Sequence, residues 1–354
     1  MHFRAAIRLR PDYSDAHNNL GNALSKLPGR SAEAIAEFET ALRLEPTMAQ
    51  AHNNLGCILI NTPGRVDDGI AHLRTALQLH PDYAETHDSL GVALAKIPGR
   101  LPEAIAEYEA AVQLKPDYPE AWSNLGNALV AAGRPADAIA PLVRARQLRP
   151  NDPVIHYNLG TVLALAGRPA EAVGEFERAL QLRPDDAAAQ INLGNVLTQL
   201  GRGSEAVAHY RVALQLDPNS AEAHFNLGRA LRNVGDGREA IAQFQAALRA
   251  APQAAPIWSS LGSALLQAER ASEAVAAYAE AVRLEPRAAP YRNNLGLALT
   301  GAGRFADAIL QFRQALELAP GFADAHYNLA VALQQAGRSD EAAAEFAASG
   351  RARP

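Results

Sequence analysis

A leucine–glycine pair returns along the whole chain at a spacing of 34 or 35 residues. The copies are Leu20-Gly21, Leu55-Gly56, Leu90-Gly91, Leu125-Gly126, Leu159-Gly160, Leu193-Gly194, Leu227-Gly228, Leu261-Gly262, Leu295-Gly296 and the variant Leu329-Ala330. A proline closes every unit, at Pro46, Pro81, Pro116, Pro150, Pro184, Pro218, Pro252, Pro286, Pro320 and Pro354. Self-similarity at such a period is typical of repeat architectures, in which each unit buries its apolar face against its neighbours.

Each unit has the pattern of two helices joined by a short turn. Trp122, Leu125 and Leu129 fall on one face of a helix with 3.6 residues per turn. Gly133 then breaks the pattern, and a second apolar-periodic segment runs to the closing proline. In the next unit this second segment carries an aromatic residue, Phe176, and most units have an equivalent aromatic. The sequence therefore predicts pairs of antiparallel helices.

The glycine of the Leu-Gly pair lies inside the first helix of each pair. Glycine in a helix interior costs roughly 1 kcal/mol relative to alanine. Because nine units keep it, we expect the two helices of a unit to approach closely there, with Ala330 still small enough. The aromatic slot of the second helix is expected to be core, and nine aromatics fill it: Phe3, Phe38, Tyr108, Phe176, Tyr210, Phe244, Tyr278, Phe312 and Phe346.

The order of a large residue, Leu-Gly, a small-residue turn, Ala, an aromatic, Ala and Pro resembles the tetratricopeptide repeat, from Phe3 to Pro354. The resemblance implies an all-α solenoid, a right-handed superhelix of antiparallel helix pairs whose first helices line a concave groove. We expect a partial repeat with a second helix only at 1–13, and one continuous solenoid over 14–354. Its ten units are expected to start at residues 14, 49, 84, 119, 153, 187, 221, 255, 289 and 323.

The large residue four places before the glycine departs from the family pattern. It is Trp at Trp122 and Trp258 only, and otherwise His17, His52, His87, Gln190, Arg292, His156, His224 or His326. Histidines that share the repeat period are unlike a catalytic or metal cluster. We expect them to be packing residues with one satisfied ring nitrogen.

We number each unit so that the Leu-Gly glycine is position eight, which places positions five and six on the face opposite the core. Position six holds Asn19, Asn54, Ser89, Asn124, Asn158, Asn192, Asn226, Ser260, Asn294 and Asn328. An amide donates and accepts, so a row of them matches the backbone of an extended peptide. The row resembles the asparagine ladder in the repeat domain of O-GlcNAc transferase, which holds a protein substrate. The alternative is that these amides bond to neighbouring helices and set the repeat spacing.

Position five adds an apolar stripe at Tyr157, Ile191 and Phe225, with Tyr327 further along. Aromatic side chains on a concave surface are typical binding hot spots. The alternative is a groove wall that packs against itself. Arg229, with Arg232 beside it, follows Phe225 by one turn and either meets an acidic group of a ligand or is a solvated pair.

Composition excludes several classes of function. A net charge of −5 opposes binding driven by nucleic-acid phosphates. The single cysteine, Cys57, has no base at a persuasive spacing, and no phosphate-binding loop or metal-ligand motif occurs. No apolar run reaches the length of a membrane span, and no export signal is evident. We therefore expect no cofactor, no metal, no membrane insertion, no nucleic-acid partner and, by default, a cytoplasmic protein.

The sequence favours a non-catalytic scaffold that binds an extended segment of a partner protein in its groove through the asparagines. The alternative is the substrate-recruiting arm of a larger enzyme, such as a glycosyltransferase, whose catalytic domain lies outside this chain. The ends lack a polar capping helix, which solenoids usually need. End-to-end self-association through these termini is therefore a further expectation.

Overall fold

The computed structural model describes residues 2–351, so Pro354, predicted to close the last unit, lies outside the described residues. Within that range all regular secondary structure is α-helical. The first helices of the repeats are α2 (Ser14–Ser25), α4 (Ala49–Leu59), α6 (Ala84–Ala95), α8 (Pro119–Ala131), α10 (Pro153–Leu165), α12 (Ala187–Gln199), α14 (Ala221–Asn233), α16 (Ala255–Gln267), α18 (Ala289–Gly301) and α20 (Ala323–Gln335). The second helices are α1 (His2–Leu9), α3 (Ser31–Leu44), α5 (Val66–Leu79), α7 (Leu101–Leu114), α9 (Pro135–Leu148), α11 (Pro169–Leu182), α13 (Gly203–Leu216), α15 (Gly237–Ala250), α17 (Ala271–Leu284), α19 (Phe305–Leu318) and α21 (Ser339–Ser349).

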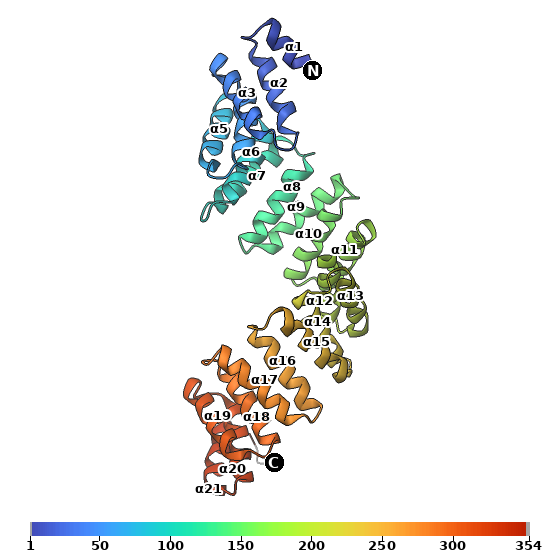
Figure 1. Cartoon of the computed structure of the whole chain (residues 1–354), viewed down its shortest axis with the longest axis vertical. Coiled ribbons are helices and arrows are strands. Elements are labelled where there is room, and N and C mark those ends of the chain that lie inside the picture. The colour runs from blue at the N-terminus through green and yellow to red at the C-terminus, as the bar shows by residue number, and fades with distance from the viewer. Residues whose placement is uncertain (1, 352–354) are drawn as a thin grey trace. The chain divides into compact units, whose positions relative to one another are not determined.

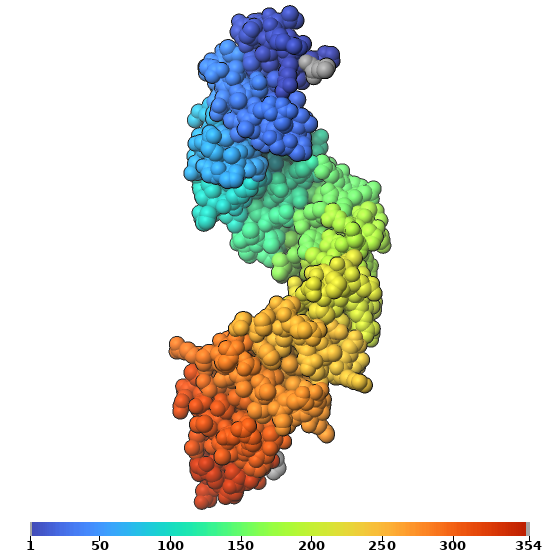
Figure 2. All heavy atoms as spheres, in the orientation of Figure 1, coloured from blue at the N-terminus to red at the C-terminus, as the bar shows by residue number. Residues whose placement is uncertain are grey.

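The helices form two compact units, unit 1 up to Leu182 and unit 2 from Arg183. Within each unit every helix packs against the next in chain order (Figure 1), and side chains fill the space between the ribbons (Figure 2). First helices of neighbouring repeats also touch, as α6 and α8 do in unit 1 and α18 and α20 in unit 2. The all-α solenoid is thereby confirmed, while continuity across residues 182 and 183 stays a prediction.

Local sequence signals set the helix ends. Gly133 adopts a φ of 74° in the turn between α8 and α9, a conformation that other residues adopt only with strain. Asp152 caps α10 by accepting a hydrogen bond from the backbone N–H of Val154, and Pro153 fills the first helical position, where no backbone donor is needed. Pro46 follows the end of α3, which it cannot continue.

In nine of the ten repeats the core depends on the glycine at position eight. A Cβ atom added at Gly228 would lie 2.7 Å from the ring of Phe244, and one at Gly296 would lie 2.5 Å from the ring of Phe312. Both distances are shorter than side chains tolerate, so the second-helix ring occupies the space that glycine leaves. The predicted close approach is confirmed.

The residue at position four makes the same hydrogen bond in nine of the ten repeats. A side-chain N–H of His, Trp or Arg donates to the carbonyl of the proline six residues earlier, as in His156 to Pro150 at 3.0 Å, Trp122 to Pro116 at 3.0 Å and Arg292 to Pro286 at 3.1 Å. These side chains replace one another because each offers a ring or guanidinium N–H.

Six histidines at position four also use their second ring nitrogen, so the expectation of one satisfied nitrogen is corrected to two. In four of these repeats Nδ1 faces a glutamate of the second helix, as His87 faces Glu107 at 2.6 Å. His52 instead faces His72, with 2.9 Å between the two Nδ1 atoms. One of the two Nδ1 atoms must donate and the other must accept, so this contact cannot form when both rings are protonated.

Truncation of a core ring tests the packing at position eight. Phe176 is 1% exposed, so Phe176→Ala is expected to lower the free energy of unfolding by about 3–5 kcal/mol. Urea unfolding followed by circular dichroism measures the loss. Glu177→Ala, at an exposed neighbouring position of α11, is the control and should change stability by less than about 1 kcal/mol. A loss of stability below about 1 kcal/mol for Phe176→Ala would contradict this packing.

The histidine pair makes the second repeat sensitive to acid. Burial, and then His52, lower the pKa of His72 below its ordinary value. A histidine with a lowered folded-state pKa contributes stability that is present above its ordinary pKa and is lost as the pH falls.

His72→Glu installs the residue found at this place in four other repeats and is expected to raise the midpoint of thermal unfolding at pH 5.5. The gain corresponds to about 0.5–1 kcal/mol and should shrink at pH 8, where protonation of His72 no longer opposes the contact. His72→Gln, which copies the 2.6 Å contact of His224 with Gln243, is the neutral control and should give a smaller gain. A His72→Glu effect that is equal at both pH values would contradict the acid sensitivity.

Candidate functional site

Positions five and six of the first helices form a surface that we call the first-helix face. In unit 1, Asn54 Nδ2 donates to Asn18 Oδ1 at 3.0 Å, from α4 to α2. Two repeats later, Asn124 Nδ2 donates to Asp88 Oδ1 at 2.9 Å, from α8 to α6. A position-six amide therefore donates to the position-five side chain of the preceding repeat, and so fixes the spacing of neighbouring first helices.

Unit 2 repeats this arrangement with one variation. Asn328 Nδ2 donates to Asn293 Oδ1 at 2.9 Å, which links α20 to α18. Asn293 Nδ2 in turn donates to Asn294 Oδ1 at 3.4 Å. Asn226 Nδ2 donates to Asn195 Oδ1 at 3.1 Å, an acceptor at position nine of the preceding repeat.

The inter-repeat bonds leave part of each amide uncommitted. Asn54, Asn124 and Asn328 are half-buried, and so is Asn226. Each uses one N–H in the contact with the preceding repeat, while an amide also has a second N–H and a carbonyl oxygen. Among the described residues no buried side-chain nitrogen or oxygen lacks a hydrogen-bond partner. The remaining polar atoms of these amides are thus accessible to solvent or to a ligand.

The other predicted position-six residues differ in exposure. Asn19 is exposed, and Asn158 and Asn192 are half-buried. Ser89 accepts a hydrogen bond from the thiol of Cys57 at 3.2 Å, and Ser260 donates to the carbonyl of Pro256 in its own helix.

Position five is more buried than its place opposite the core suggested. Asn18, Asn53, Asp88 and Asn293 are buried, because the next repeat packs over this position. Ile191 is 8% exposed, which leaves it little surface for a ligand. The expected apolar stripe is therefore corrected at Ile191.

The three predicted aromatics at position five are half-buried against the second-helix ring of their own repeat. The ring centroids are 5.9 Å apart for Tyr157 and Phe176, 6.0 Å for Phe225 and Phe244, and 5.7 Å for Tyr327 and Phe346. Their outer surfaces remain partly exposed. Arg229 is exposed and lies over the ring of Phe225, with 5.7 Å from its Cζ atom to the ring centroid. Arg232 donates to Ser263 at 3.3 Å.

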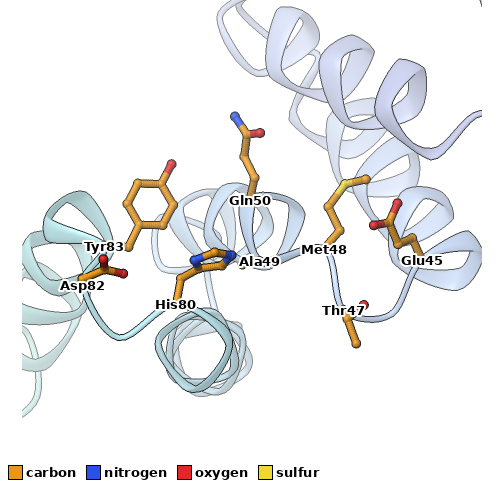
Figure 3. A pocket seen from close by; sticks show the side chains of 8 residues that line it. All are labelled: Glu45, Thr47, Met48, Ala49, Gln50, His80, Asp82 and Tyr83. Carbon is orange, nitrogen blue, oxygen red and sulfur yellow. The ribbon is translucent and has the colours of Figure 1, made fainter.

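Unit 1 has several cavities, and two of them lie beside the starts of α4 and α8. One, of about 530 Å³, is lined by the turns that precede α4 and α6. Figure 3 shows Tyr83 and Asp82 on one side of it and Met48 and Glu45 on the other, with Gln50 between them. The second, of about 320 Å³, borders the first-helix face and is lined by Asp88, Tyr118, Pro119, Glu120, Ser123, Asn124, Arg149, Asp152, Val154 and Ile155.

Residues 2–351 contain no group of three or more His, Cys, Asp or Glu side chains placed to hold a metal ion. Burial raises the pKa of the Cys57 thiol, which disfavours the nucleophilic thiolate. None of the described helices has the length and apolar character to cross a bilayer.

Repeated helix pairs with a polar face define a helical-repeat interaction protein. Profiles described as "Tetratricopeptide repeat" match residues 29–84, 123–187 and 225–293, residues 299–354, and residues 2–36, and a profile described as "TPR repeat" matches residues 98–133 and 194–235. The chain belongs to the tetratricopeptide repeat family. Its repeats make it a protein-interaction scaffold.

Solved structures with this fold include the Cut9–Hcn1 hetero-tetramer of the APC/C. Its match is 18% identical, covers 91% of this chain and 60% of that chain, and has a TM-score of 0.53. YrrB, described as a TPR protein with an unusual peptide-binding site, is 29% identical over 49% of this chain and 90% of its own, with a TM-score of 0.44. MamA is 25% identical over 44% of this chain and 92% of its own, with a TM-score of 0.42. A comparison with curated proteins gives no match.

Two features of this face escaped the sequence analysis. Asn195, at position nine, accepts hydrogen bonds from both Asn226 and Tyr210. Asp88 lines a cavity and is the one acidic residue at position five of the ten units. A comparison of position five across the units would have singled it out.

Proposed function

We propose that the first-helix face of each unit binds an extended segment of a partner protein through its backbone. The observation that carries this proposal is the double role of the position-six amides. One N–H joins neighbouring repeats, as between Asn124 and Asp88, and the rest of the amide remains accessible. The amide is therefore held in a fixed orientation before any ligand arrives, which reduces the entropy cost of binding.

The chemistry suits a peptide backbone better than a particular side chain. A peptide unit presents one N–H and one C=O, and the uncommitted part of an asparagine amide presents the same pair. Each such hydrogen bond contributes only about 0.5–1.5 kcal/mol net, so several repeats must act together. Half-buried rings such as Tyr157 and Phe225 would add apolar contact beside the amides.

The test uses 12-residue peptides selected from a random library for binding to the full chain. The double variant Asn54→Ala and Asn124→Ala removes two amides of unit 1. The affinity of peptides that bind unit 1 is expected to fall roughly 30-fold, which is about 2 kcal/mol for the lost hydrogen bonds. Isothermal titration calorimetry measures the change.

Two controls separate backbone recognition from other effects. Asn151→Ala, in an exposed turn of unit 1, should leave the affinity unchanged. Peptides with N-methylated backbone amides should bind as poorly to the parent as ordinary peptides bind to the double variant. Equal affinity of the parent for methylated and unmethylated peptides would contradict the proposal.

The alternative expectation, a substrate-recruiting arm of a larger enzyme, stays a prediction. Both functions require the same peptide-binding face, and they differ in whether a catalytic domain is joined to the repeats. The complete reading frame around this chain decides between them.

A further inference from the structure

The cavity of about 320 Å³ that borders the first-helix face has an unusual charge pattern. It lies between α6 and the N-terminal halves of α8 and α10, and its lining carries the carboxylates of Asp88, Glu120 and Asp152 and the guanidinium of Arg149. Asp88 and Asn124 belong at once to this cavity and to the first-helix face. A peptide bound to that face would therefore lie beside the opening of this cavity.

The cations near this cavity already have partners. Arg149 donates to Glu120, with which it forms a salt bridge. Lys115 donates to Glu85 at 2.6 Å and lies over the ring of Tyr118. Within residues 2–351 Asp88 has no basic side chain in ion-pair contact.

Asp88 has a charge that its structural role does not require. Its Oδ1 accepts from Asn124 and its Oδ2 accepts from Tyr118 at 3.2 Å. In two other repeats the neutral amides of Asn18 and Asn293 accept the equivalent inter-repeat hydrogen bond. The hydrogen bond between neighbouring repeats thus requires an acceptor at this position but does not require a carboxylate.

A carboxylate in this place is costly without a cation. Asp88 is 8% exposed, and burial of a charge without a counter-ion is unfavourable. Burial in the first place, and then the neighbouring Glu120 and Glu85, raise the pKa of Asp88 above its ordinary value, although its two hydrogen-bond donors oppose this. A cation inside the cavity would remove this cost.

We propose that this cavity receives a cationic side chain, lysine or arginine, of the bound peptide, with Asp88 as its counter-ion. This inference rests on the proposed function and adds a sequence preference to it. Asp152, whose Oδ1 caps α10, adds a second carboxylate to the wall. The ring of Tyr118 and the side chain of Pro119 form an apolar wall for the aliphatic stem of the ligand side chain.

The test uses N-acetyl-arginine amide and N-acetyl-lysine amide as probes, with N-acetyl-citrulline amide as the neutral match for arginine. Binding to the full chain is measured by nuclear magnetic resonance titration at low ionic strength. The parent is expected to bind both cationic probes at least ten-fold more tightly than the citrulline probe. Binding of the cationic probes should also strengthen as the pH rises and Asp88 ionises.

Asp88→Asn is the matched variant, because asparagine occupies this position in other repeats and keeps the acceptor for Asn124. It should retain the thermal midpoint of the parent and lose at least ten-fold in affinity for the cationic probes. Asp82→Asn removes the same charge from an exposed turn and should change nothing. The preference of the parent for arginine over citrulline tests the inference even without a variant.

Equal binding of arginine and citrulline probes, an absence of binding by the cations, or an Asp88→Asn affinity within two-fold of the parent would overturn the inference. The probes are too short to span several repeats. The peptide-binding test with the Asn54→Ala and Asn124→Ala double variant is therefore independent of this one. If that test fails while the cationic probes still bind, only the extended-peptide function is contradicted.

Discussion

The missing side chain at position eight, which nine of the ten repeats share, is the constraint on which the rest depends. Because Gly228 has no Cβ, the ring of Phe244 packs directly on the backbone of the first helix. The cost of a helical glycine, about 1 kcal/mol, is offset by burial of a large ring. This close contact fixes the rotation of the first helix about its axis, which leaves the position-six side chains half-buried or exposed and directs position five toward neighbouring side chains.

The repeat period and the chemistry of glycine were enough to predict the helix pairs and their closest point of contact. The exposure of position five was less predictable, because it depends on how the next repeat packs. Ile191 and Asn18 share a helical position with the half-buried Tyr157, yet both are buried by neighbours. Likewise, hydropathy does not reveal that His, Trp and Arg at position four share one N–H donor to a proline carbonyl.

The two interpretations of the asparagines do not exclude one another. Asn124 bonds to the preceding repeat and so takes part in setting the spacing, as one interpretation held. The same bond holds the amide in place, which is what a binding site needs. A single charge at Asp88 then distinguishes one repeat from the others, because the neutral residues at the equivalent positions support the same contact.

The most direct test of this account observes the asparagine side chains themselves. With ¹⁵N-labelled asparagine, the side-chain amide resonances of Asn54 and Asn124 can be assigned by substitution and followed as a selected peptide is added. The account predicts that both resonances shift in step with binding, while that of Asn219, in an exposed turn of unit 2, stays in place. A peptide that saturates unit 1 and leaves the Asn54 and Asn124 resonances unmoved would contradict it.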